Sequence, residues 1–305
     1  MRIAFVGAVE GSAIGLKALI DAEFPPSIVV TLPPEARFRH SDYVDLTPLA
    51  NAAGSALLHA THVNRPEVVN ALRAMGVDIT LVIGWSQICG EAFRSAARIG
   101  SIGFHPAPLP RLRGRAVIPW TILLGESETA ASLFWLDNGV DSGPILMQEP
   151  IEVSPEETAR GLYAKQTGAL ARMLPKAIRL IRDGEAPKIP QDHGAATYCA
   201  KRTPEDGRID WREPAEAILR LIRAVGDPYP GAFTTHNRGR LFIDEARLLP
   251  DSHRYIGLAG QVQCYTPDGF AVRCGDGLSI NITRWRQEQG SARPNLHAKL
   301  GTPDQ

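Results

Sequence analysis

A histidine and two aspartates are the residues of this sequence best suited to move a proton. His105 follows a short apolar run and opens a loop rich in proline and arginine, while Asp137 and Asp141 lie further along in a segment punctuated by glycine. A carboxylate beside an imidazole fixes the tautomer of the ring, raises its proton affinity and orients it as a general acid or base. The competing roles are strand capping for His105 and turn formation for at least one aspartate; the chemistry needs only one carboxylate.

The pattern of apolar residues places His105 at the edge of a parallel sheet. From residue 1 to about 185, short apolar runs alternate with helical periodicity, which is typical of a mostly parallel sheet covered by helices. His105 ends one predicted strand, and ligands of such sheets bind beyond the carboxyl ends of the strands. The predicted strands are Ile3–Val6, Ile28–Thr31, Ala56–Leu58, Ile79–Ile83, Ser101–His105, Ala130–Trp135 and Pro144–Glu149. The predicted helices are Ser12–Ala22, Leu46–Ala53, Pro66–Met75, Glu91–Ala97 and Pro155–Arg182.

A second domain is predicted after a charged, proline-containing linker, Asp183–His193. One helix, Pro214–Val225, precedes short β-like runs separated by Pro-Asp-Gly and Gly-Asp-Gly turns, which favours a small barrel. These runs are Ala232–Thr235, Arg240–Ile243, Gly260–Tyr265, Phe270–Cys274 and Leu278–Thr283. We expect a first domain over residues 1–190, a second over 196–290 and a polar, frayed tail over 291–305.

Composition excludes several classes of protein. The 305 residues include 33 basic and 33 acidic side chains, so the chain lacks the excess charge of proteins that hold nucleic acid or anionic membranes mainly by electrostatics. No run of about 18 apolar residues could span a membrane, and Glu10 and Lys17 interrupt the apolar amino terminus, which disfavours a signal peptide. The four cysteines form no Cys-x-x-Cys pair and are expected to be reduced thiols of a cytoplasmic protein.

Two further patterns point to no cofactor site. His59 and His62 have metal-ligand spacing, but no nearby cysteine or carboxylate completes a set, so no metal ion is expected. Gly7 and Gly11 lack the spacing of a dinucleotide-binding loop. The sequence also lacks a Gly-x-Ser-x-Gly elbow, in keeping with transfer that needs no covalent enzyme intermediate.

A composite motif extends from Gly103 to Gln148. It contains His105, Leu109–Pro110, Arg113–Gly114, Gly125–Glu126, Thr129 and Asp137–Gly143. This pattern resembles the core of formyltransferases that use 10-formyltetrahydrofolate as co-substrate. Further on, Tyr198–Trp211, Ile222–Ala224 and Pro228–Phe233 are similar to the start of the second domain in the methionyl-tRNA and amino-sugar members of that family. The resemblance implies an α/β, Rossmann-like formyltransferase domain with a mostly parallel sheet, followed by a smaller OB-like β-barrel.

The resemblance also implies roles for individual residues. His105, oriented by Asp141, would take a proton from the attacking amine and help to pass one to the departing folate nitrogen. The pterin would lie against the loop after the fourth strand and the loop around Asp141. These cofactor-binding residues are Gly84, Trp85, Ser86, Gln87, Ile88, Val140 and Ser142, with core filling as the alternative for Trp85 or Ile88. Arg113, Gly114 and Arg115 would bind an anionic part of the substrate, or else form a solvated basic loop.

Gly103 is the main departure from the family pattern. Relatives carry asparagine there, and its amide helps to hold the formyl oxygen as negative charge develops. Losing one such donor typically costs about 10²–10³ in rate. Asn138, a backbone N–H or a water could replace it; the transferred group could differ from formyl; or the domain could be a weak catalyst. Retention of His105 and Asp141 favours the first explanation.

Charge guides the choice of acceptor. A methionyl-tRNA enzyme is expected to have a basic loop near residues 35–45, but here the loop Glu35–Asp45 has nearly balanced charges. We therefore expect a small amine acceptor, either a nucleotide-linked amino sugar or a siderophore-type amine or hydroxylamine. The alternatives are a methionyl-tRNA formyltransferase, a formyltetrahydrofolate hydrolase and a weakly catalytic folate-binding module. By analogy with sugar-modifying relatives, a homodimer is expected.

Overall fold

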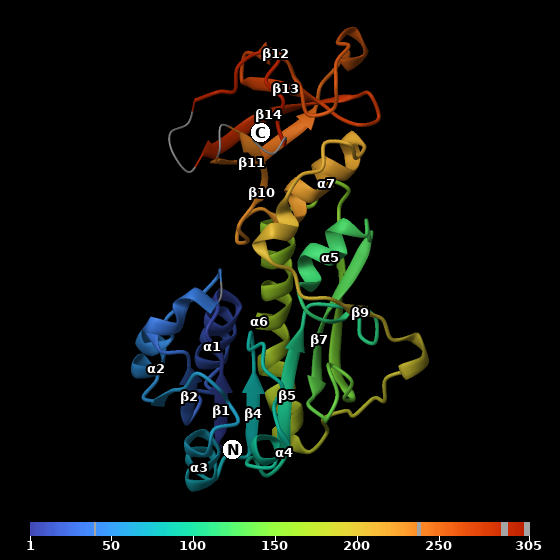
Figure 1. The fold of residues 1–305 in the computed structure, drawn as a ribbon. Coiled ribbons are helices and arrows are strands. Elements are labelled where there is room, and N and C mark those ends of the chain that lie inside the picture. Colours follow the sequence, from blue (N-terminus) through green and yellow to red (C-terminus); the bar gives the residue numbers. More distant parts are fainter. Residues whose placement is uncertain (40, 237–238, 288–291, 302–305) are drawn as a thin grey trace. The chain divides into compact units, whose positions relative to one another are not determined.

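The protein, described here from a computed structural model, folds into two compact units (Figure 1). The structure describes residues 1–39, 41–236, 239–287 and 292–301. Unit 1 comprises Met1–Val117, Ser127–Val153 and Leu162–Lys201, and unit 2 comprises Ile118–Glu126, Ser154–Gly161 and Arg202–Gln305. The segment predicted to be a linker therefore folds as part of unit 1.

Unit 1 is built on a seven-stranded sheet with strand order β3-β2-β1-β4-β5-β7-β8 (Figure 1). Strands β1 to β5 run parallel and β7 and β8 are antiparallel. The strands are β1 (Ile3–Val6), β2 (Ile28–Thr31), β3 (Ala56–His59), β4 (Ile79–Val82), β5 (Gly100–His105), β7 (Glu128–Trp135) and β8 (Ile145–Glu152). All residues of β1, β2 and β4 are buried, as expected for parallel strands covered on both faces.

The helices agree with the sequence pattern, except at α5, at the start of α6 and at the end of α4, which stops at Arg94 and not at Ala97. The helices from α1 to α6 are α1 (Glu10–Asp21), α2 (Thr47–Ala52), α3 (Pro66–Ala74), α4 (Glu91–Arg94), α5 (Val117–Leu123) and α6 (Ala159–Asp183). The short helix α5 was not predicted. Helix α6 begins four residues later than expected because Pro155 lies in a turn, closed by the bond from the Glu157 N–H to the Ser154 carbonyl. The remaining short elements of this half are η1 (Pro34–Arg39), β6 (Arg113–Gly114), η2 (His193–Ala195) and β9 (Tyr198–Cys199).

The strand order reverses beside β1, where β2 and β4 flank it. The ends of β1 and β4 are tied by Ser12, whose hydroxyl donates to the Ile83 carbonyl at 2.7 Å and accepts from the backbone N–H of Ala8 at 3.1 Å. Gly7 makes this approach possible, since a Cβ there would lie 2.5 Å from the Ser12 hydroxyl oxygen. Gly7 thus serves packing, and the crevice beyond the strands lies at a switch point of the kind that binds ligands in α/β proteins.

Unit 2 contains a five-stranded antiparallel sheet, β10-β11-β14-β13-β12. Helix α5, apart from Val117, also belongs to unit 2. The other elements of unit 2 are η3 (Pro204–Gly207), α7 (Ala215–Val225), β10 (Ala232–His236), β11 (Gly239–Leu248), η4 (Ser252–Arg254), β12 (Val262–Thr266), β13 (Gly269–Arg273) and β14 (Ser279–Gln287). Phe233, Phe270 and Ile282 are buried in its core. A smaller OB-like β-barrel domain was predicted after the α/β domain; the structure has a C-terminal antiparallel β domain there, and the fold class is confirmed.

The described part of the tail is packed and does not fray as predicted. The Leu300 N–H donates to the Gly260 carbonyl at 2.8 Å, and the Leu300 side chain is buried. Residues 291 and 302–305 of the predicted tail lie outside the described residues, as do residues 237–238 and 288–290 of the predicted second domain. Among the described residues, no helix is long and apolar enough to span a membrane.

Candidate active site

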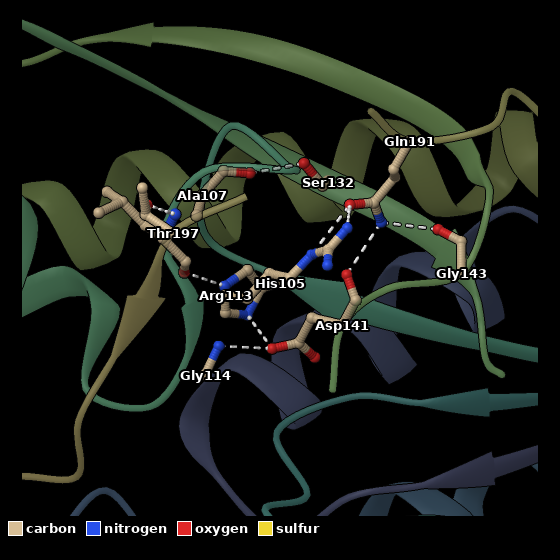
Figure 2. A network of polar contacts seen from close by, with 10 residues as sticks. His105, Ala107, Arg113, Gly114, Ser132, Asp141, Gly143, Gln191 and Thr197 are labelled. Carbon is tan, nitrogen blue, oxygen red and sulfur yellow. Dashed lines mark hydrogen bonds and ion pairs between the residues drawn. The ribbon is translucent and has the colours of Figure 1, made fainter. Parts of the chain in front are cut away.

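His105 and Asp141 meet beyond the end of β5 (Figure 2). His105 is the last residue of β5 and is only 5% exposed. Its Nε2 lies 2.7 Å from the Leu112 carbonyl oxygen, and its Nδ1 lies 3.5 Å from the Asp141 carboxylate. Because a carbonyl oxygen can only accept, Nε2 carries a proton and Nδ1 is the nitrogen turned toward Asp141.

The two aspartates of the glycine-bounded loop have different tasks. Asp137 stabilises the turn, because its carboxylate accepts from the Gly139 N–H at 3.0 Å and from the Ser142 hydroxyl at 2.7 Å. Asp141 faces the histidine, and its carboxylate also accepts from the Gly114 N–H at 2.8 Å. Of the two roles predicted for the aspartates, turn formation therefore applies to Asp137 and contact with the histidine to Asp141.

The loop that contacts His105 is held by the segment after α6. The Thr197 hydroxyl accepts a hydrogen bond from the Leu112 N–H at 2.9 Å, and the Thr197 carbonyl accepts one from the Arg113 N–H at 2.9 Å. Strands β6 and β9 then pair in parallel. Gly114 has φ = 103°, and a Cβ there would lie 2.5 Å from the Cys199 carbonyl oxygen, so only glycine allows the two segments to approach.

The three residues predicted to bind substrate have separate environments. The Arg113 side chain is 1% exposed, and its guanidinium donates to Gln191 Oε1 at 2.6 Å and to the Tyr198 hydroxyl at 3.1 Å. The Gly114 N–H is used by Asp141. Arg115 is exposed and is the one of the three arranged to reach solvent. Gln191 was missed by the sequence analysis, since the surrounding linker has no periodicity that would assign it to a site.

Apolar side chains occupy the space beside Gly103. The residue pairs with Phe134 of β7, and a Cβ on Gly103 would lie 2.9 Å from the Phe134 ring and 2.7 Å from Leu136 Cδ2. The space is therefore too crowded for an asparagine side chain. Asn138, the predicted oxyanion donor, is exposed, and its side-chain oxygen accepts from Arg94 of α4. The structure thus gives Asn138 a partner other than the His105–Asp141 pair.

The loop predicted to hold the pterin is partly built into the core. Gly84 has φ = 68°, and Trp85 packs against two buried apolar clusters while its indole N–H donates to Gln87 Oε1 at 3.1 Å. Ile88 and Val140 are exposed, and they are the two predicted contacts that offer an apolar surface. Ser86 is also exposed, and Ser142 is committed to Asp137.

A cavity of about 480 Å³ lies beside this loop. Its lining residues are Arg39, Thr61, His62, Asn64, Arg65, Pro66 and Gln87. Gln87 is fixed there because its amide donates to the Thr61 carbonyl at 2.7 Å. The sequence analysis missed Arg39 and Arg65, which give the cavity two cationic groups. No cluster of three or more potential metal ligands occurs in the described part of the chain.

Comparisons with known proteins agree on one family. Residues 1–178 match the family model "Formyl transferase", and residues 201–294 match "Formyl transferase, C-terminal domain". The methionyl-tRNA formyltransferase of Symbiobacterium thermophilum is 35% identical over 295 residues, covering 96% of this chain and 90% of that protein. The methionyl-tRNA formyltransferase of Anaeromyxobacter dehalogenans is 33% identical over 303 residues, covering 99% of this chain and 97% of its own length.

Solved structures share the fold at lower identity. An N-formyltransferase from Helicobacter canadensis, in complex with folinic acid and dTDP-3-aminofucose, has a TM-score of 0.67 at 18% identity and covers 93% of this chain and 99% of its own. Methionyl-tRNA formyltransferase from Clostridium thermocellum has a TM-score of 0.57 at 19% identity, with coverages of 82% and 95%.

The expected acceptor was wrong. We predicted a nucleotide-linked amino sugar or a siderophore-type amine or hydroxylamine, with tRNA disfavoured, whereas relatives at 31–35% identity over most of the chain are methionyl-tRNA formyltransferases. The nearly balanced charge of residues 35–45 therefore did not identify the acceptor. Two aspartates of this segment have neutral hydrogen-bond donors as partners and keep their charge. Asp42 accepts from the Tyr163 hydroxyl at 2.6 Å, and Asp45 accepts from the Thr47 N–H at 2.9 Å.

The basic residues of the same segment are presented to solvent. Arg37, Phe38 and Arg39 are all exposed on η1. Glu35 is exposed as well, and His40 lies outside the described residues. Asp45 is exposed too, so the exposed charges of the described segment balance, and its distinctive feature is the exposed aromatic ring between two arginines.

Proposed function

Since this chain belongs to the formyl transferase family, we propose that it transfers a formyl group from 10-formyltetrahydrofolate to the amino group of methionyl-tRNA. The predicted formyltransferase activity and folate co-substrate are confirmed at the level of the family. The choice of acceptor rests on one observation, the near full-length relationship to methionyl-tRNA formyltransferases. Acting on charged tRNA would place the protein in the cytoplasm, and the homodimer stays a prediction.

His105 and Asp141 supply the proton transfer in this proposal. Attack of the neutral amine on the formyl carbon leaves a proton to be removed from the nitrogen. Nδ1 of His105 is the acceptor, because Nε2 already donates to Leu112. The Asp141 carboxylate, 3.5 Å from Nδ1, stabilises the positive charge that the ring gains. The same proton then passes toward the departing folate nitrogen.

Several groups of the described structure fit a folate. The pterin is flat and apolar on its faces, and Ile88 and Val140 offer exposed apolar side chains. The other end of a folate carries glutamate carboxylates, and the cavity lined by Arg39 and Arg65 matches their charge. Arg39 is oriented there by the bond from its guanidinium to the Thr61 carbonyl at 2.8 Å.

The η1 segment supports an RNA acceptor. Phe38 is 82% exposed and is flanked in sequence by two exposed arginines, Arg37 and Arg39. Exposed aromatic rings stack on unpaired bases, and arginines bind phosphates. This combination suits the single-stranded end of a charged tRNA better than a small, weakly charged amine.

The test is an acceptor assay with purified protein and 10-formyltetrahydrofolate. Methionyl-tRNA, uncharged tRNA and free methionine are compared, with tetrahydrofolate release and formylated product both measured. Of the three acceptors, only methionyl-tRNA should give formylated product, and tetrahydrofolate should be released in an equal amount. Formate release without an acceptor would instead identify a hydrolase, and folate binding without turnover would identify a binding module; either result overturns the proposal.

A further inference from the structure

Gln191 links the two loops that carry the candidate catalytic pair (Figure 2). Its side-chain N–H₂ donates to the Asp141 carbonyl at 2.9 Å and to the Gly143 carbonyl at 2.7 Å. Its side-chain oxygen accepts from Arg113, at 2.6 Å from Nη2 and 3.2 Å from Nε. Gln191 is 6% exposed, so these bonds are shielded from water.

The orientation of this amide is fixed by chemistry. Both neighbours of its nitrogen are carbonyl oxygens, which only accept, and its oxygen faces a guanidinium, which only donates. Reversing the amide would place its oxygen against two carbonyl oxygens and its N–H₂ group against the guanidinium. Gln191 can therefore be satisfied in one orientation alone, and that orientation fixes both loops.

The contacts form a closed circuit around the carboxylate. Asp141 accepts from Gly114 through its side chain and from Gln191 through its backbone. Gly114 follows Arg113 in the chain, and the Arg113 guanidinium donates to Gln191, which closes the circuit. Asp141 needs this support because its φ of 51° lies in the left-handed region, which costs a non-glycine residue free energy unless its surroundings impose it.

Arg113 anchors the circuit. Besides Gln191, its guanidinium contacts the Tyr198 hydroxyl at 3.1 Å and His193 Nδ1 at 3.2 Å. All three partners belong to residues 191–198, which lie in unit 1. The position of the Asp141 backbone is thus set by a segment well separated in sequence from both catalytic loops.

We propose that Gln191 is a positioning residue, which holds Asp141 so that its carboxylate faces Nδ1 of His105. The kinetic consequence rests on the proposed function. Misplacing a catalytic group by about 1 Å can cost about 10² in rate, so loss of Gln191 should reduce kcat by roughly 10- to 100-fold. Folate binding should fall less than kcat, because Gln191 does not line the cavity and acts on Val140 only through the backbone of Asp141.

The experiment compares Gln191→Met, Gln191→Glu and the control Gln263→Met. Methionine keeps the length without hydrogen bonds. Glutamate keeps an acceptor for Arg113 but places a carboxylate oxygen against two carbonyls. Gln263 is a buried glutamine of unit 2 whose amide donates to the Gln261 carbonyl at 3.0 Å, so it controls for loss of a buried amide. Gln191→Asn, which retains the amide, replaces any variant that fails to fold.

Three measurements are made on each full-length variant: imidazole resonances of ¹⁵N-labelled histidine, affinity for 5-formyltetrahydrofolate, and kcat with methionyl-tRNA. His105→Asn assigns the His105 signals. We expect Gln191→Met and Gln191→Glu to shift the His105 signals and to lower kcat by roughly 10- to 100-fold. Their folate affinity should stay within about threefold of wild type, by the same positioning argument. Gln263→Met should change neither the His105 signals nor kcat.

Unshifted His105 signals in Gln191→Met would overturn the positioning role. So would a kcat within about threefold of an active wild type, since the positioning argument requires a larger loss. If wild type itself fails to formylate methionyl-tRNA, the proposed function fails, and the resonances alone then decide the role of Gln191.

Discussion

A network of polar side chains is buried at the catalytic edge of unit 1, whereas charged side chains of unit 2 such as Arg247 and Asp268 pair at its surface. His105, Arg113 and Gln191 are shielded from water, and each has identified partners. On unit 2, Arg247 and Asp268 form a 2.6 Å ion pair with both side chains exposed. An exposed pair contributes about 0–1 kcal/mol, whereas an unsatisfied buried polar group costs about 1–3 kcal/mol. Polar contacts therefore determine the geometry of the site, whereas those on the surface of unit 2 contribute little to its stability.

Backbone strain follows the same division. Six non-glycine residues in the described part of the chain have positive φ, and three of them, Leu112, Ala116 and Asp141, lie in the two loops beside His105. Such conformations persist only where the surrounding contacts impose them. The buried polar network is thus the cause of the loop geometry, and removing its members should affect activity more than any surface change.

The largest effect is expected from the catalytic pair itself. His105→Ala and Asp141→Asn should each lower kcat by about 10²–10⁴, because they remove the proton acceptor or the charge that stabilises it. Single-turnover rates with methionyl-tRNA measure this loss, and far-ultraviolet circular dichroism checks the fold. Unchanged rates in folded variants would contradict the assignment of the site.

A smaller effect is expected at Gly103. Gly103→Asn places atoms within 3 Å of Phe134 and Leu136, so we expect destabilisation of about 1–3 kcal/mol and no gain in turnover. Thermal unfolding and kcat measure both effects. The double variant Gly103→Asn with Phe134→Ala relieves the contact with the Phe134 ring and keeps the contact with Leu136. A large rise in turnover in the single variant would mean that the missing amide limits the rate.

Arg37 and Phe38 of η1, which do not line the cavity, should affect tRNA affinity and leave folate chemistry intact. Phe38→Ala should weaken methionyl-tRNA binding by about 1–3 kcal/mol through lost stacking, with the same salt dependence as wild type. Arg37→Ala should instead reduce the slope of log affinity against log salt by about 0.7–0.9 for one lost phosphate contact. Fluorescence titration at several salt concentrations separates the two. Arg182→Ala, an exposed residue paired with Asp183, is the control and should change neither quantity.

The smallest effect is expected at an exposed pair of unit 2. Hydrogen bonds from Arg212 lower the pKa of Asp210 to about 2 from 3.8. The pair therefore stabilises the fold above pH 3.8, and this contribution is lost as the pH falls through about 2. Arg212→Ala should return the pKa of Asp210 toward 3.8, measured by carboxyl NMR, without altering kcat. A loss of activity would show that surface pairs of unit 2 matter to catalysis.

The predicted elements were accurate where a single periodicity governed the sequence. The buried runs Ile3–Val6 and Ile79–Val82 and helix α7, with its buried apolar face, appear with nearly the predicted bounds. Helix α5 was missed because it follows a proline-rich loop and is too short to develop a clear pattern. His105 and Asp141 were identified by residue type and by the family motif, and the structure places them together.

The acceptor and the support of the site could not be predicted in the same way. The nearly balanced charges of residues 35–45 disfavoured tRNA, whereas the similarity to methionyl-tRNA formyltransferases extends over nearly the whole chain and not over that segment alone. Arg113 was assigned to a ligand, although its guanidinium is buried against Gln191. Gln191 lies far away in sequence, so no local pattern indicates it.

The amino-acid sequence by itself determined the alternation of strands and helices, the family motif and the residue types able to move a proton, because these depend on local periodicity and side-chain chemistry. Only the tertiary structure decided which aspartate faces His105, what fills the space beside Gly103 and which side chain holds the Arg113 guanidinium. Those outcomes depend on contacts between distant segments, whose distances and burial are set when the chain packs.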